Sequence, residues 1–105
     1  MKAGRFNEIF QDTVNRSRSV LVRKAGEYAD ENDRLHNFKQ AAHLQATTQR
    51  ITLGGFMAKH LVSVYDLIRK EECASLEVWD EKILDSINYL ILLRAAVIEE
   101  LEGTN

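Results

Sequence analysis

The stretch Leu76–Leu101, LEVWDEKILDSINYLILLRAAVIEEL, decides the fold of this 105-residue chain. Its apolar residues recur every three or four positions, which predicts one long amphipathic helix, and Gly103 is placed to stop it. The main apolar face consists of Ile83, Ile87, Leu90, Ile91 and Ile98. Between Tyr89 and Ile98 the helix is apolar on nearly every side, interrupted only by Arg94. We therefore expect protein to enclose this half, either from the same chain or from a second subunit.

Two helices are predicted in the first 44 residues. The first covers residues 5–29, where one apolar stripe recurs at helical spacing: Phe6, Ile9, Phe10, Thr13, Val14, Ser17, Val20 and Leu21. A polar segment, residues 30–34, then interrupts the pattern with turn-prone Asn and Asp. A short helix follows over residues 35–44, and its inward positions are Phe38, Ala41, Ala42 and Leu44.

A third helix is predicted to start after Thr47 and Thr48, which offer an N-cap, and to reach Lys70. Its apolar stripe is Met57, Leu61, Val64, Leu67 and Ile68. Gly54 and Gly55 lie near its start, and glycine inside a helix costs roughly 1 kcal/mol relative to alanine. Either the helix begins after the two glycines, or another backbone packs closely against them.

The composition fits one all-α domain spanning residues 1–105. Apolar residues make up 45% of the chain and charged residues 29%, near the globular average. The absence of proline and the presence of only five glycines exclude collagen-like and linker-like classes and argue against an all-β fold. We predict an antiparallel helical bundle of three long helices and one short helix. A domain of this size gains from forming a homodimer or a higher homo-oligomer.

Cysteine content and charge limit the cellular location and the classes of partner that the sequence favours. A single cysteine, Cys73, excludes an internal disulfide and a cysteine zinc site, which favours a reducing, cytoplasmic location. The expectation is no membrane span and no signal peptide. The net charge of −2 and the lack of interleaved aromatics in the basic stretch 16–24 disfavour nucleic acid. Residues 1–60 carry net +4 and residues 61–105 net −6, so the two halves attract each other within or between chains, unless these charges are simply solvated.

The candidate metal site begins in the last predicted helix. Glu81, Asp85 and Asn88 lie one helical turn apart on a face that continues into apolar Leu92. Carboxylate and amide oxygens suit Mg²⁺, and Asp66 of the third helix would add another carboxylate. The alternatives are acids favoured by the N-terminal half of a helix dipole and, for the stripe Lys59, Ser63, Asp66 and Lys70, plain solvent exposure. His60 is interpreted as a partly buried, hydrogen-bonded histidine rather than a ligand.

The candidate substrate site involves residues 24–39, at the junction of two helices. Tyr28 or Phe38 would stack on a base, and Lys24, Arg34 or Lys59 would meet phosphate. The alternative is that this segment serves only capping and turn formation.

Four groups of these residues resemble motifs of a family of small bacteriophage proteins. They are Lys24-x-x-Glu-Tyr-Ala29, Asp33-Arg-Leu-x-Asn-Phe-Lys39, Lys59-His-x-x-Ser-x-x-Asp66 and Glu81-Lys-x-x-Asp-x-x-Asn-Tyr-x-x-Leu-Leu93. The chain also resembles the nucleotide modification associated domain family and, more distantly, the all-α MazG-type nucleoside triphosphate pyrophosphohydrolases. A phage origin would put the protein in the host cytoplasm.

The resemblance implies a Mg²⁺-dependent nucleotide-binding protein of phage nucleotide metabolism. Its acids would hold the metal and activate water, releasing pyrophosphate and a nucleoside monophosphate. Carried onto this chain, Glu81 and Asp85 match the acidic motif of the later helix, and Asn88 follows on the same face. We expect Asp66 to join Glu81 and Asp85 as a catalytic and metal residue. The nucleotide residues that we expect are Lys24, Tyr28, Arg34, Asn37, Phe38, Lys59 and Asn88. The MazG-type Glu-Glu-x-x-Glu motif is absent, and only Asp66 is acidic in the matching helix, so hydrolysis stays open.

The alternative function is a non-enzymatic helical protein that docks a host or phage partner. In that case Glu81, Asp85 and Asp66 would form internal salt bridges with Lys59 or Arg34. Geometry separates the two hypotheses. Asp66 and Asp85 converging on an open cleft favour the enzyme, whereas both carboxylates saturated in a closed core favour the interaction protein.

Overall fold

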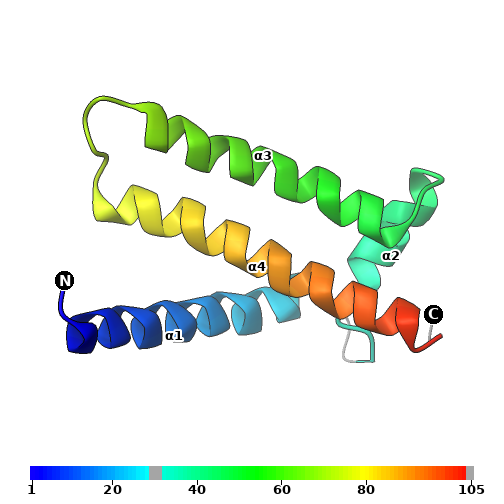
Figure 1. The fold of residues 1–105 in the computed structure, drawn as a ribbon. Coiled ribbons are helices and arrows are strands. Elements are labelled where there is room, and N and C mark those ends of the chain that lie inside the picture. The colour runs from blue at the N-terminus through cyan, green and yellow to red at the C-terminus, as the bar shows by residue number, and fades with distance from the viewer. Residues whose placement is uncertain (29–31, 104–105) are drawn as a thin grey trace.

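The chain is all-helical over the part that its computed structural model describes, residues 1–28 and 32–103, with side chains described for 1–25 and 32–103. The four helices are α1 (Ala3–Tyr28), α2 (His36–Leu44), α3 (Gln49–Arg69) and α4 (Leu76–Leu101). This arrangement of three long helices and one short helix confirms the predicted fold class (Figure 1). Within those ranges, no helix is long and apolar enough to cross a membrane.

The predicted boundary signals of α3 and α4 operate as expected. Thr48 is the N-cap of α3, and its hydroxyl oxygen accepts a hydrogen bond of 3.2 Å from the Ile51 N–H. Gly103 follows α4 with a φ of +72°, the left-handed conformation that ends helices. Helix α4 therefore covers the same residues, 76–101, that its sequence predicts.

The hydrophobic core lies where α2 closes one end of the antiparallel pair α3 and α4 (Figure 1). Leu53 of α3 is 1% exposed and packs with Leu35, just before α2, and with Ala96 of α4. The partly buried side chains packed around these three are Phe38, Tyr89, Leu92 and Leu93. This small core places the second half of α4 between α2 and α3.

Helix α1 lies outside this core and packs mainly along α4 (Figure 1). Apart from half-buried Ile9, its residues 3–12 are exposed. Further along, Ser17 is buried and Lys24 is half-buried against α4. Only the middle and end of α1 are therefore anchored to the rest of the chain.

Two details of the prediction are wrong. Leu44 does not face inward but is 85% exposed, because α2 ends there. Helix α3 begins before Gly54 and Gly55, and no described atom outside their own helix backbone lies within 4 Å of a Cβ built on either. The apolar face of α4 is not enclosed within one chain, since Leu90 and Ile91 are about half exposed, so enclosure by a second subunit stays a prediction.

Candidate functional site

Two adjoining hollows lie beside Tyr89 in the middle of α4. The smaller, of about 110 Å³, is lined by Leu21, Lys24, Arg34, Phe38, Asp85, Asn88, Tyr89 and Leu92. The larger, of about 320 Å³, is lined by Asn37, Phe38, Ala41, Phe56, Lys59 and Tyr89. Because Phe38 and Tyr89 line both, we treat the two hollows together as the Tyr89 cleft. All four helices contribute to its walls.

The smaller hollow holds opposite charges close together. Asp85 of α4 has one carboxylate oxygen 3.9 Å from the Lys24 ammonium and the other 3.6 Å from His60 Nδ1. Arg34 donates a hydrogen bond of 3.2 Å to the Leu21 carbonyl, which holds its guanidinium at the end of α1. The cations come from α1 and the α1–α2 connection, whereas the carboxylate comes from α4.

Asn88 is the most deeply buried polar side chain of the cleft, with 6% of its surface exposed. Its side-chain carbonyl accepts a 2.5 Å hydrogen bond from the Ser17 hydroxyl of α1. Within the described part of the chain, its Nδ2 has no hydrogen-bond partner. An unpaired buried amide group is costly, so this N–H₂ still lacks the acceptor that a buried donor normally has.

Aromatic rings form the side of the cleft between α2, α3 and α4. His60 stacks on Tyr89, with ring centroids 4.9 Å apart and planes inclined by 25°. Phe38 meets Tyr89 edge to face at 6.5 Å, and Phe56 lies 6.4 Å from Tyr89. These contacts fix the Tyr89 ring from three sides, which suits a rigid platform for a planar ligand.

The structure brings together most of the substrate residues expected from the sequence. Lys24, Arg34, Phe38 and Asn88 line the smaller hollow, and Asn37, Phe38 and Lys59 line the larger. The side chain of Tyr28 lies outside the described residues. Sequence reasoning missed Tyr89 and Phe56 as wall residues, and it missed His60 as the ring that stacks on Tyr89. Tyr89 follows Asn88 and stands one turn after Asp85, so spacing offered a signal for it.

The three predicted metal ligands are not gathered in the cleft. Asp85 lines it, whereas Glu81 and Asp66 are exposed and line neither hollow. Among the described residues, no three His, Cys, Asp or Glu side chains are grouped as a metal site would need. The residues present do not fit a resident Mg²⁺, which prefers six oxygen ligands. Magnesium binding stays a prediction. Asp66 and Asp85 neither converge on the cleft nor are both saturated in a closed core, so neither geometry that separates an enzyme from an interaction protein is met in full.

The connection before α2 serves capping as well as the cleft. Asp33 accepts a 3.0 Å hydrogen bond from the Leu35 N–H, and Lys39 bridges Asp33 at 2.8 Å and Glu99 of α4 at 2.9 Å. The hydrogen bond from Lys39 lowers the pKa of Asp33, and the Asp33 and Glu99 carboxylates raise the pKa of Lys39. This network orients the α2 end that carries Asn37 and Phe38.

Comparisons with family models, curated proteins and solved structures found no match to this chain. The phage and MazG-type resemblance therefore stays a prediction from the motifs. Function has to be argued from the Tyr89 cleft itself.

Proposed function

We propose that this protein binds a nucleotide in the Tyr89 cleft. The observation that carries the proposal is the convergence of cations, an unpaired amide donor and stacked rings from all four helices. Lys24, Arg34 and Asn88 line the smaller hollow, and Tyr89 lines both hollows. Among the described residues, the buried Asn88 Nδ2 has no hydrogen-bond partner. Ligand sites of proteins combine an aromatic or apolar wall with a few convergent polar groups in this way.

Each group has a defined part in the proposed complex. Lys24 and Arg34 neutralise phosphate, and Lys59 at the rim of the larger hollow adds a further positive charge. Phe38 and Tyr89 stack on the base. Asn88 donates to a base or sugar oxygen, and Asp85 accepts from a hydroxyl. The larger hollow alone, at about 320 Å³, reaches the lower end of the range for small-molecule sites.

Asp85 also holds Lys24 near the smaller hollow in the absence of a ligand. Its carboxylate faces Lys24 and His60 at distances of 3.9 and 3.6 Å, longer than direct hydrogen bonds. Lys24 is thus held near the hollow without being saturated by Asp85. A phosphate oxygen can take over the ammonium group at little cost in lost contacts.

We further propose that the protein acts in phage nucleotide metabolism and releases pyrophosphate from its nucleotide. These two parts of the proposal rest on the motif resemblance alone. Of the three predicted metal ligands, Asp85 alone lines the cleft, so the part of the chain's residues there is to bind and orient the nucleotide. Pyrophosphate release with Mg²⁺ that disappears in Asp85→Asn would establish the enzyme.

The binding experiment is a thermal-shift panel of ribo- and deoxynucleoside mono-, di- and triphosphates, with and without Mg²⁺. A nucleotide that binds only the folded state raises the melting temperature with its concentration. We expect a shift of the melting temperature for nucleotides of at least one base, larger for the triphosphate than for the monophosphate. If no nucleotide moves the melting temperature at millimolar concentration, the proposal is wrong.

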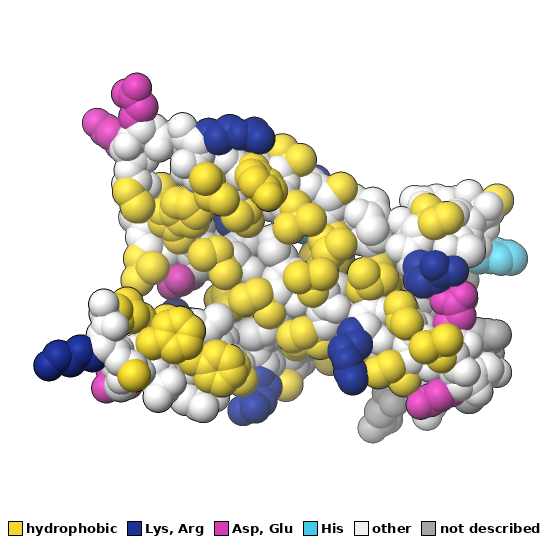
Figure 2. All heavy atoms as spheres, viewed as in Figure 1, with side chains coloured by type: hydrophobic (Ala, Val, Ile, Leu, Met, Phe, Trp, Pro, Cys, Tyr) yellow, Lys and Arg dark blue, Asp and Glu magenta, His cyan; other side chains and the backbone are white. Residues whose placement is uncertain are grey.

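The second candidate function, a non-enzymatic interaction protein, is favoured by a different observation. Figure 2 shows hydrophobic side chains spread over one face of α1, α4 and α3, with charged groups mostly toward the edges. Exposed apolar patches of this extent mark interaction sites. A homo-oligomer, expected from the sequence, is part of our proposal and accounts for this face without a foreign partner.

A further inference from the structure

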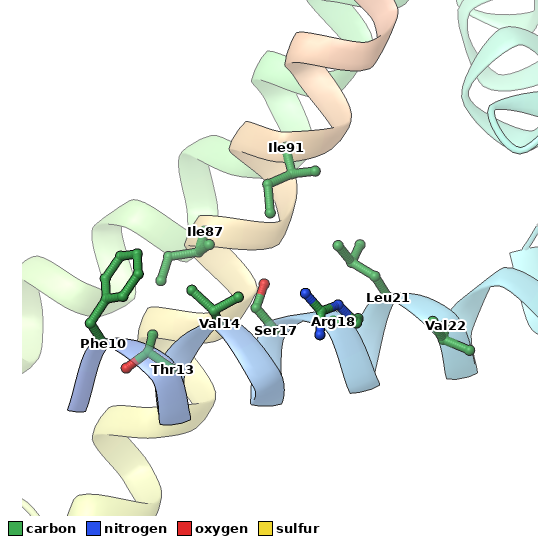
Figure 3. Close-up of a pocket in the computed structure, with 9 residues that line it drawn as sticks. All are labelled: Phe10, Thr13, Val14, Ser17, Arg18, Leu21, Val22, Ile87 and Ile91. Atoms are coloured by element: carbon green, nitrogen blue, oxygen red, sulfur yellow. The ribbon is translucent and has the colours of Figure 1, made fainter. Parts of the chain in front are cut away.

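An apolar groove lies between α1 and the middle of α4. It has a volume of about 550 Å³, and Figure 3 shows Phe10, Val14 and Leu21 of α1 opposite Ile87 and Ile91 of α4. The groove is distinct from the Tyr89 cleft, which lies at the other side of Ser17 and Asn88. An open apolar hollow of this size leaves both helices incompletely covered.

The chain exposes far more surface than a compact monomer of its mass. Its accessible surface is 7861 Å², whereas a folded monomer of 12.0 kDa exposes about 6,000 Å². The radius of gyration is 15.9 Å, against about 13 Å for a compact domain of this length. The excess of about 1,900 Å² exceeds the roughly 800 Å² that each partner buries in a standard interface.

The exposed apolar side chains are placed around the groove. Phe6 and Phe10 of α1 are 60% and 55% exposed, and Val22 is 68% exposed. On α4, Leu90 and Ile91 are about half exposed. Together these five residues define the α1–α4 face. Burying them would remove large apolar groups from water, which is the main driving force of association.

Charge favours a second copy of the chain on this face. Helix α1 carries five basic and three acidic residues, net +2, and α4 carries six acidic and two basic residues, net −4. In a two-fold dimer each copy presents the same face, so α1 of one copy can meet α4 of the other. The same pairing already occurs within the chain, where Arg16 approaches Asp80 at 3.8 Å.

We propose that the α1–α4 face binds a second copy of this chain in a two-fold dimer that fills the groove. Phe10 and Val22 of α1 and Ile91 of α4, which line the groove and are exposed in one chain, become the center of the contact. Opposite net charges on α1 and α4 set the mutual orientation. The dimer supplies the enclosure that the all-round apolar part of α4 lacks in one chain.

The dimer also braces the wall of the cleft. Leu21 lines both the groove and the cleft, and Ser17 lines the groove while it bonds Asn88. Holding α1 against α4 therefore keeps Lys24 in place. This consequence rests on the proposed nucleotide site, whereas the existence of the dimer does not, so mass and ligand binding are measured separately.

The test is the mass in solution, measured by sedimentation equilibrium over a wide concentration range. We expect the wild-type chain at twice 12.0 kDa. Phe10→Glu and Ile91→Glu should weaken the dimer by about tenfold or more, because each buries a charge at the center of the contact. The control is Leu44→Glu, at an exposed leucine of α2 away from the face, which should dimerise like wild type. Circular dichroism checks that each variant keeps its helices.

If a glutamate variant fails to fold, cross-linking tests the proposed dimer instead. In a Cys73→Ser background, Ile91→Cys should cross-link two copies with a short bismaleimide, and Leu44→Cys should not. A wild-type chain that stays at 12.0 kDa throughout overturns the proposal and leaves the face to a different protein. A dimer that Phe10→Glu leaves intact and that cross-links through residue 44 also overturns it.

Discussion

The hydroxyl of Ser17 on α1 donates a hydrogen bond of 2.5 Å to the side-chain carbonyl of Asn88 on α4, 71 positions along the chain. Both side chains are buried, at 4% and 6% exposure. This bond joins α1 to the rest of the fold at the boundary between the groove and the Tyr89 cleft. It also fixes the orientation of the Asn88 amide, whose residue lines the cleft.

Removing the Ser17 hydroxyl should destabilise the fold. Ser17→Ala leaves the Asn88 carbonyl buried without its donor, which costs about 1–3 kcal/mol in free energy of unfolding. Urea denaturation followed by circular dichroism measures the loss. Ser19→Ala, at an exposed serine of the same helix, is the matched control and should change stability by less than about 0.5 kcal/mol. Equal losses in both variants would refute a specific role for the bond.

Replacing the glycines inside α3 should stabilise the protein. No described atom lies within 4 Å of a Cβ at Gly54 or Gly55, leaving out their own helix backbone, so alanine fits there without a clash. We expect Gly55→Ala to raise the free energy of unfolding by up to about 1 kcal/mol. Gly103→Ala is the contrast, since its φ of +72° disfavours a side chain, and it should destabilise. A destabilised Gly55→Ala would show that the position is needed for something else.

The Lys39 network should make stability depend on pH in a defined direction. The lowered pKa of Asp33 means that its contribution is present above its ordinary value of 3.8 and is lost as pH falls through the lowered value. The raised pKa of Lys39 means that its contribution is complete below 10.5 and is lost as pH rises through the raised value.

Lys39→Met tests this. We expect a loss of about 1 kcal/mol at pH 7, since these partly exposed groups are screened by solvent. The difference from wild type should shrink when urea denaturation is repeated at a pH below the lowered pKa of Asp33. A difference that stays the same there would show that Lys39 stabilises through its methylene stem and not through its charge.

The helices could be predicted from the sequence because their signals are local. Thr48 caps α3, Gly103 stops α4, and the three- and four-residue spacing marks each apolar stripe. Which stripe faces the core is not a local property. On α4, buried Asn88 and Ala96 face inward, whereas Leu90 and Ile91 lie outside, because the position of α1 leaves them uncovered.

The candidate site was predictable only in part, because spacing along one helix is local whereas contacts between helices are not. Asp85 and Asn88 share a helix face by spacing, but their meeting with Lys24 depends on how α1 crosses α4. Glu81 and Asp66 had the right residue type and spacing, yet both are exposed, since a few tens of degrees of helix rotation decide between cleft and solvent. The Tyr89 ring is positioned by contacts with Phe38, Phe56 and His60. These rings come from other helices, so the pattern of α4 alone could not predict the contacts.

The most direct test of the account is calorimetric titration with the nucleotide that gives the largest thermal shift. The titration compares wild type, Lys24→Gln and Arg23→Gln, two variants that each remove one positive charge from neighbouring positions of α1. Because Lys24 lines the cleft while Arg23 is exposed, the account predicts about tenfold weaker binding in Lys24→Gln and near wild-type affinity in Arg23→Gln. Equal affinity in all three proteins, or no heat of binding to wild type, would contradict nucleotide binding in the Tyr89 cleft.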